Sequence, residues 1–276
     1  MRLALGIEYD GSGFHGWQTQ KGVGTIQRAV ESALTAVADH PVRAQCAGRT
    51  DSGVHACAQV IHFETTSVRR ERGWLLGANA NLPSTVSVLW VRPVTDEFHA
   101  RYSATARLYR YVIANRMARN GLWSRKVTWE CRALDVEAMA IAAAGLIGEH
   151  DFSSFRGAEC QAKNPVRRLS RLKVARLGDL IFVDAEANGF LHHMVRNIVG
   201  VLVAIGRHER SIAWARQVLN ARDRTQAGVT APADGLYLVG VRYPAHYALP
   251  EPIQSLPFEP HDTSRAIPVP NAAYRG

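Results

Sequence analysis

The sequence predicts an α+β protein with two mixed domains, in which antiparallel sheets are flanked by helices. Three observations predict this class: segments where apolar and polar residues alternate, segments where apolar residues recur at helical spacing, and a coarse strand, helix, strand order in each half of the chain. The 276 residues are 47% hydrophobic and 21% charged, so the chain can bury a sizeable core. This composition excludes wholesale disorder and a collagen-like structure.

The first half combines both kinds of segment. Residues 3–9 alternate as a half-buried strand does, and they end in a turn cluster. Thr25 can cap a helix whose apolar residues recur at helical spacing and which is expected to end near His40-Pro41. The other elements expected here are strands at 42–46 and 58–63, a weaker helix at 70–80 and a strand at 86–91.

The second half repeats the rhythm without a convincing sequence repeat. Residues 105–114 alternate so that Arg107, Tyr109 and Tyr111 share one face of a strand. Asp135 can cap the helix that follows. The other elements expected here are strands near 168–177, 180–187 and 236–243 and helices near 191–205 and 212–221.

A domain boundary is expected near residues 115–120, which divides the chain into domains 1–115 and 116–245. Seven of the twelve prolines lie in the last 33 residues. Segment 246–276 is therefore expected to be an extended, non-catalytic, proline-rich tail.

The charge of the chain comes from arginine. The net charge is +9 with a pI near 9.8, and only four of the 33 cationic residues are lysines. A planar guanidinium suits phosphate contacts and base stacking, which favours a nucleic-acid partner, although a GC-rich genome would also raise the arginine content.

Two basic runs contain no acidic residue: one between His99 and Trp129, the other between Cys160 and Gly178. On strands they would present arginines to phosphates, with tyrosines available for stacking. The alternative is a solvated face that acids from elsewhere in the fold neutralise.

Several classes of protein are not expected. No window approaches 18 uninterrupted apolar residues, and we expect neither a membrane span nor a signal peptide. The four cysteines form no CxxC pair, which argues against a disulfide framework or a cysteine zinc site and favours the reducing cytoplasm. The glycine clusters lack the spacing of ATP or NAD cradles. His192 and His193 are adjacent, and on a helix their side chains would point about 100° apart, so no metal site is expected.

The densest cluster of chemical groups is the segment 47–55, between two expected strands. It contains Arg49 and Asp51, bracketed by Gly48 and Gly53. A carboxylate here could act as nucleophile or general base, and the nearby cation would hold it ionised. The same residues also suit an ordinary turn.

Taken with other segments, this cluster resembles the TruA-type tRNA pseudouridine synthase family over nearly the whole chain. The segments, in the family's order, are Tyr9-Asp10-Gly11, Gly16-Trp17-Gln18, Gly48 to Ala56, Phe98-His99-Ala100-Arg101, Tyr109-Arg110-Tyr111, His150 to Phe155, Phe190 to Ile198 and Gly235 to Leu238. The resemblance implies the pseudouridine synthase fold, with an active-site cleft between the domains. It also implies isomerisation of uridine to pseudouridine at positions 38, 39 and 40 of the tRNA anticodon stem-loop, by a homodimer that uses no cofactor and no metal.

The resemblance also implies residue roles. Asp51 is the catalytic carboxylate, whether it attacks C1′ or abstracts a proton on a route through a glycal. The target uridine must be flipped out of the stem, and Arg49 is the candidate to occupy the space that the base leaves. Tyr109 stacks on the flipped uracil, Arg196 pairs with Asp51, and Leu236 walls the base pocket. From the residues alone, each of these four has a structural alternative: an ion pair for Arg49, core packing for Tyr109 and Leu236, and a surface position for Arg196.

Two other functions compete with the isomerase. A catalytically idle RNA-binding protein or RNA chaperone would use the same basic faces. A carboxylate-dependent hydrolase of small phosphorylated substrates would need a metal cluster or a second carboxylate near Asp51.

Overall fold

One mixed sheet forms the centre of the protein. The computed structural model describes residues 1–251. Within them, the main path of the sheet runs β4-β1-β3-β10-β5-β9-β8-β7, while β2 pairs with β3 and β6 with β5. The strands are β1 (Arg2–Tyr9), β2 (Gln45–Cys46), β3 (His55–Glu64), β4 (Val86–Val94), β5 (Ala106–Asn115), β6 (Thr128–Glu130), β7 (Gly148–Asp151), β8 (Val166–Leu177), β9 (Leu180–Ala187) and β10 (Leu236–Arg242).

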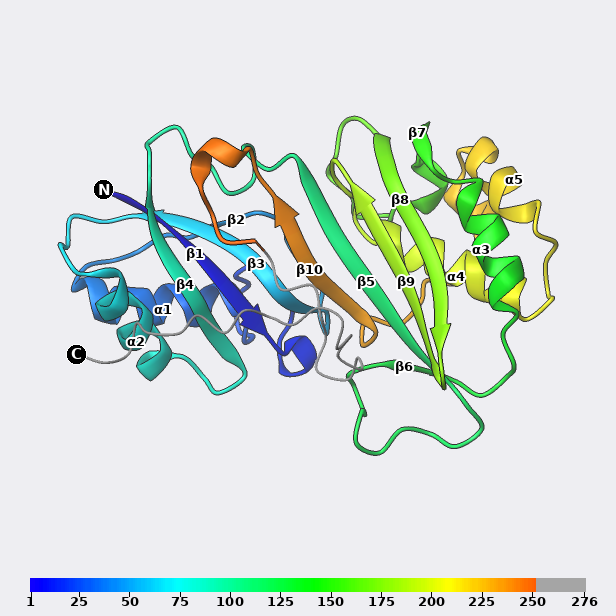
Figure 1. Ribbon diagram of the computed structural model, residues 1–276, viewed down its shortest axis with the longest axis horizontal. Coiled ribbons are helices and arrows are strands. Elements are labelled where there is room, and N and C mark those ends of the chain that lie inside the picture. Colours follow the sequence, from blue (N-terminus) through cyan, green and yellow to red (C-terminus); the bar gives the residue numbers. More distant parts are fainter. Residues whose placement is uncertain (252–276) are drawn as a thin grey trace.

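The helices lie in two groups at opposite ends of this sheet (Figure 1). One group is α1 (Ile26–Ala38) and α2 (Glu71–Asn81), and the other is α3 (Val136–Ala144), α4 (Met194–Gly206) and α5 (Trp214–Ala221). Buried residues of all five belong to a single apolar core, so both groups cover the same face. None of the helices within residues 1–251 has the length and apolar content needed to cross a bilayer.

Strand β10 joins the two halves of the chain. It pairs in parallel with β3, through Tyr237 and His55, and antiparallel with β5, through Leu236 and Tyr111. The sequence analysis expected antiparallel sheets in separate domains. In the structure the last strand returns to the middle and makes one continuous, mostly antiparallel sheet, with parallel pairings at β10–β3 and β5–β6. The α+β class is confirmed, and the division into 1–115 and 116–245 stays a prediction.

The two faces of the sheet differ in what covers them. Along β5, Tyr109 and Tyr111 belong to the core beneath the helices, while Leu108 and Val112 belong to a smaller cluster on the other face. This alternation is the one predicted from the sequence. The second face is covered in part by the connection from β5 to β6, which contributes Trp123. The helix-covered face is therefore the one on which Tyr109 lies.

Most elements form where the sequence predicts them, with instructive differences at their ends. Asp135 caps α3 through a hydrogen bond from the Ala138 amide, 2.9 Å long. Thr25 occupies the cap position of α1, but its buried hydroxyl makes no hydrogen bond. Helix α4 begins at Met194 rather than 191 because His193 has a left-handed backbone, with φ of 61°. The short strands β6 and β7 were not predicted, since three or four residues carry too little periodicity.

The start of the predicted tail is packed rather than extended. Residues 245–247 form a 3-10 turn, and the ring of Tyr247 lies 5.0 Å from that of Phe98. These contacts hold the segment that follows β10 against the N-terminal half. The rest of the predicted tail, residues 252–276, lies outside the described residues.

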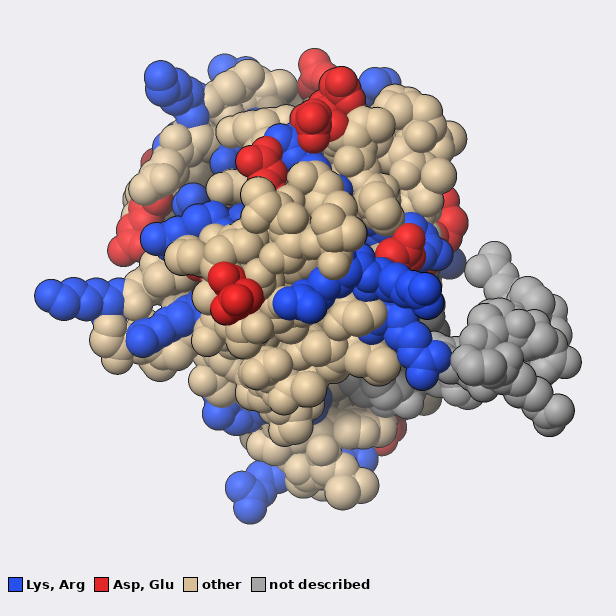
Figure 2. Space-filling model, turned by 90° about the vertical axis from the view of Figure 1, so that its left-hand side faces the viewer, with Lys and Arg blue, Asp and Glu red and all other residues tan. Residues whose placement is uncertain are grey.

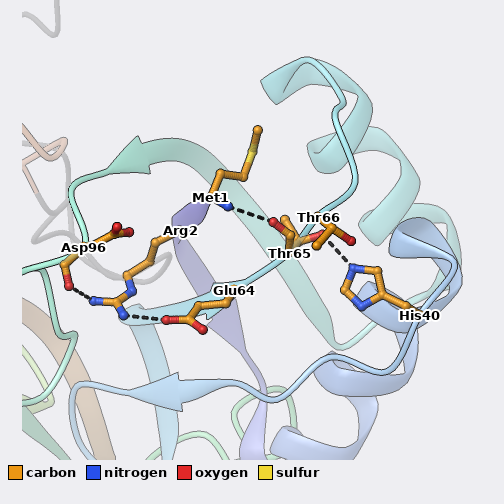
Figure 3. Close-up of a pocket in the computed structure, with 7 residues that line it drawn as sticks. All are labelled: Met1, Arg2, His40, Glu64, Thr65, Thr66 and Asp96. Atoms are coloured by element: carbon orange, nitrogen blue, oxygen red, sulfur yellow. Dashed lines mark hydrogen bonds and ion pairs between the residues drawn. The ribbon is translucent and has the colours of Figure 1, made fainter.

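A shallow pocket opens beside the start of β1 (Figure 3). The N-terminal ammonium donates a 2.9 Å hydrogen bond to the Thr65 carbonyl, and Arg2 pairs with Glu64 at 2.5 Å. These contacts hold the start of β1 against the end of β3. None of the residues lining the pocket is one of the predicted site residues, so we assign the pocket to the scaffold.

The buried histidine on β3 makes the stability of the fold sensitive to acid. His62 accepts a hydrogen bond from the Ala100 amide and packs against His99. Burial, aided by the positive charges of His99 and Arg2, lowers the pKa of His62 to about 4. An unfolded histidine titrates near 6.5, so between these values the unfolded chain binds more protons and acid favours unfolding.

We therefore expect the melting temperature of the wild type to fall more steeply than that of His62→Gln as the pH is lowered from about 6.5 to about 4. Glutamine keeps an acceptor for the Ala100 amide without a titrating group. Thermal denaturation followed by circular dichroism at several pH values measures the difference. Parallel curves for the two proteins would contradict the assignment.

Candidate active site

The loop from Ala47 to Val54, between β2 and β3, carries the predicted catalytic residue and is held by hydrogen bonds from both sides. The Trp17 amide donates to the Thr50 carbonyl at 2.9 Å, and the Tyr9 hydroxyl lies 2.8 Å from the Thr50 hydroxyl. On the other side, the side-chain amide of Gln59 donates a 2.6 Å hydrogen bond to the Gly48 carbonyl. The loop is thus fixed to β1 and β3, and the side chain at 51 starts from a defined backbone.

Two glycines of the segment after β1 make this close approach possible. A Cβ on Gly11 would stand 1.9 Å from the Val54 carbonyl oxygen. Gly16 has a φ of +80°, and a Cβ there would stand 2.7 Å from the Thr50 carbonyl oxygen. The segment 10–17 can therefore press its backbone against the loop only if these positions lack a side chain.

Asp51 is surrounded by three nitrogen-bearing side chains from the second half of the chain. The guanidinium of Arg196 lies 3.2 Å from Oδ2. The Nε2 atoms of His192 and His193 lie 3.3 Å from Oδ1 and 3.4 Å from Oδ2. With the Asp51 side chain 23% exposed, the carboxylate is oriented and balanced by these groups while remaining open to a ligand.

Arg196 is fixed at a second point. Its Nε donates a 2.8 Å hydrogen bond to the Ala231 carbonyl, and its side chain is only 15% exposed. The backbone of α4 at this residue accepts in turn from the Ala231 amide. Arg196 is therefore an internal arginine aimed at Asp51, and the surface alternative considered from the sequence does not apply.

The histidine pair corrects an expectation from the sequence. His192 and His193 precede α4, so the 100° separation of adjacent helical side chains does not govern them, and that argument against a shared ligand is wrong. The left-handed backbone of His193 stacks the two rings at 3.8 Å. Burial lowers the pKa of His193, against the opposing charge of Asp51.

Sequence reasoning missed these two residues at the site. The available signal was that the apolar stripe of the helix begins only at Met194, which leaves the pair at the helix start, where a cap conformation can redirect side chains. The three ligand atoms, one each from Asp51, His192 and His193, lie within 4.8 Å of one another, so the group could hold a metal ion.

Tyr109 lies in the sheet beside the loop. Its ring makes an edge contact with Phe190 at 5.1 Å, and its hydroxyl lies 3.6 Å from where a Cβ on Gly48 would stand. Burial raises the pKa of this phenol well above its usual value, and the charge of Asp51 adds to the effect. Leu236 is buried on β10 opposite Tyr111, while Leu238 is the strand partner of Tyr109. Two leucines, Leu236 and Leu238, therefore lie on this face of the sheet, whereas the sequence analysis named only Leu236.

Arg49 lies on the surface of the loop. It is exposed, and within residues 1–251 no hydrogen bond or ion pair engages its guanidinium, so the structural ion pair considered from the sequence is not formed there. Burial raises the pKa of the Cys46 thiol to about 12, against the positive charges of Arg49, Arg101 and Arg107. These three arginines thus gather around the start of the loop.

The sequence analysis expected the two basic runs to present their arginines to phosphates, but several of these arginines pair with groups of the protein instead. Arg110 points to the face opposite Tyr109 and makes a two-pronged ion pair with Asp184 at 2.5 and 2.9 Å. Arg171 shares the same carboxylate at 3.6 Å. Asp184 on the neighbouring strand β9 therefore pairs with one arginine from each run, as the alternative interpretation held.

Other cations of the first run bind the protein itself. Arg125 donates to the Ser12 carbonyl, and Lys126 pairs with Asp10. Although burial opposes it, the hydrogen bond from Lys126 holds the pKa of Asp10 far below its usual value.

The end of the molecule that carries α1, α2 and β4 shows more surface from Lys and Arg than from Asp and Glu (Figure 2).

Comparison with known proteins shows where this arrangement belongs. A model of the family described as tRNA pseudouridine synthase matches residues 6–103 and 142–244. This chain is a member of the tRNA pseudouridine synthase family. The matched ranges include the loop with Asp51 and the segment with both histidines and Arg196.

Family relatives are similar over almost their whole length. A protein named tRNA pseudouridine synthase A from Nitrosococcus oceani is 59% identical over 250 residues, which is 91% of this chain and 96% of the relative. Proteins of the same name from Methylococcus capsulatus and Pseudoalteromonas atlantica are 58% and 55% identical, over 90% and 91% of this chain and 92% and 95% of the relatives.

Replacing Arg196 with lysine tests the importance of its two contacts in this pseudouridine synthase family member. Lysine keeps the charge but cannot reach both the Ala231 carbonyl and Asp51 with a planar fork. The loss of one charge-assisted hydrogen bond corresponds to a roughly 10- to 100-fold lower kcat. Arg216→Lys is the matched control, because Arg216 is exposed on α5. Equal rates for both variants in single-turnover assays would contradict a role for Arg196 geometry.

Proposed function

We propose that this protein converts uridine to pseudouridine in tRNA, at positions 38, 39 and 40 of the anticodon stem-loop. The observation that carries the proposal is an oriented carboxylate, Asp51, held by Arg196 beside a buried tyrosine, in a chain that belongs to the tRNA pseudouridine synthase family. The names of its relatives, tRNA pseudouridine synthase A, support the same substrate.

The reaction requires one carboxylate and a site that retains the base. The N1–C1′ bond breaks, the uracil turns, and C5 bonds to C1′. The hydrogen at C5 then leaves as a proton, and N1 ends with a proton, so the reaction is an isomerisation that needs no oxidant. Asp51 either attacks C1′ or removes a proton on a route through a glycal, and both routes need it ionised.

The surrounding residues match these needs. Arg196 and the histidine pair hold the carboxylate in place. Tyr109 and Leu236 supply an aromatic and an apolar surface that can retain the detached uracil. Flipping the target nucleotide costs a few kcal/mol, and the exposed guanidinium of Arg49 on the loop can fill the vacated stack.

The alternative function, an idle RNA-binding protein, is separated by one assay. Formation of the C5 glycosidic bond expels the hydrogen at C5, so the isomerase releases tritium from tRNA labelled with [5-³H]uridine. An idle RNA-binding protein would bind tRNA tightly and release none. We expect release by the wild type.

Asp51→Asn is expected to lower tritium release by at least about 10³-fold, because a carboxamide neither attacks C1′ nor accepts a proton. tRNA binding, measured by filter retention, should be nearly unchanged, since phosphate contacts come from arginine and lysine. Loss of both binding and turnover would show instead that Asp51 is structural.

Binding should weaken steeply with salt, and the cations near the loop should account for the slope. Arg101→Gln is expected to reduce the slope of log K against log salt by about 1. Its guanidinium lies over the exposed ring of Tyr102. Lys173→Gln is the matched control, because Lys173 is exposed on β8 next to Asp184, on the face away from the site. Equal slopes for both variants would reject this binding surface.

The proposal includes a homodimer in the cytoplasm that works without cofactor or metal. None of the four cysteines forms a disulfide, which supports a reducing compartment. Sedimentation of the full chain with and without tRNA tests the oligomeric state.

A further inference from the structure

The side chains of Asp51, His192 and His193 bring three ligand atoms within reach of one metal ion. The His192 Nε2 atom lies 3.3 Å from Oδ1 and the His193 Nε2 atom lies 3.4 Å from Oδ2. Bonds of about 2.0–2.1 Å to a zinc ion at tetrahedral angles place two ligands about 3.3–3.4 Å apart. All three ligand atoms lie within 4.8 Å of one another, close enough for one ion to reach them.

Backbone contacts position the two histidine rings. The Gly157 amide donates a 2.8 Å hydrogen bond to the His192 carbonyl, which fixes the backbone before α4. A Cβ on Gly157 would stand 2.8 Å from Nδ1 of His192 and 3.1 Å from Nδ1 of His193, so glycine lets this backbone lie against both rings. Each ring therefore turns its Nε2 toward the same carboxylate.

We propose that Asp51, His192 and His193 bind one transition-metal dication of the zinc type and that this metal inhibits the protein. Two imidazoles and one carboxylate suit zinc, cobalt or nickel better than magnesium or calcium, which prefer oxygen ligands. Three protein ligands leave a fourth position for water.

Inhibition rests on the proposed function of Asp51. A carboxylate oxygen bound to a dication is no longer available to attack C1′ or to accept a proton, and the ion would occupy the space beside the carboxylate that the flipped uridine needs. Arg196 already lies 3.2 Å from Oδ2. The metal must share the carboxylate with this cation, so binding is weaker than at a structural zinc site and reversible by a chelator.

Cobalt titration of the full chain tests the site without any assay of activity. We expect one equivalent of Co²⁺ to give the visible absorption of a tetrahedral ion, displaced by Zn²⁺. His192→Gln and His193→Gln should each bind at least about 10-fold more weakly, since even the loss of a residue behind a ligand costs that much. His208→Gln is the control, because His208 is 72% exposed at the other end of α4, about 20 Å away.

Equal binding by the wild type and both variants, thiolate-to-cobalt absorption from a cysteine, or no tetrahedral spectrum would each overturn the proposed site. Tritium release with and without Zn²⁺, each protein compared with its own metal-free rate, then tests inhibition. We expect wild type and His208→Gln to lose activity at zinc concentrations at least about 10-fold below those needed for His192→Gln or His193→Gln. A wild type that binds cobalt but never releases tritium would refute the proposed function and leave the metal site standing.

Discussion

The pairing of β10 with both β3 and β5 is the constraint on which the site depends. β3 follows the loop that carries Asp51, and β5 carries Tyr109. By lying between them, β10 places Leu238 beside Tyr109 and joins the two halves of the chain into one sheet. Leu236 lies on the same strand. Helix α4, which packs over the other half, then delivers Arg196 to a carboxylate 145 positions earlier in the sequence.

Much of the fold follows from local patterns. Strand β9 and the Asp135 cap lie where alternation and capping chemistry predict them. The position of β10 in the sheet does not follow from local patterns, because a strand's neighbours depend on contacts made across the whole chain. The histidine pair was misjudged for a related reason: one residue with a left-handed backbone moves a helix start and turns two rings, and periodicity does not reveal it.

The electrostatics show the same limit. Counting charges along the sequence suggested that both basic runs face phosphates, but Arg110 and Arg171 pair with Asp184 of the adjacent strand. The spacing of Arg49 and Asp51 did place both in one loop. The family resemblance implied that Arg196 pairs with Asp51, which charge counting alone could not show. Because Arg196 takes this place, Arg49 stays exposed and has no protein partner within residues 1–251.

The parallel contact between β10 and β3 has a consequence for how the protein folds. Tyr237 and His55 are neighbours in the sheet but far apart along the chain, so a long loop must close before they meet. Closing so long a loop has an entropic cost that local contacts do not repay, and high contact order slows folding. During refolding, secondary structure should therefore appear well before the carboxylate acquires its partners. During synthesis, the sheet that holds the active site therefore cannot be completed until β10 has left the ribosome.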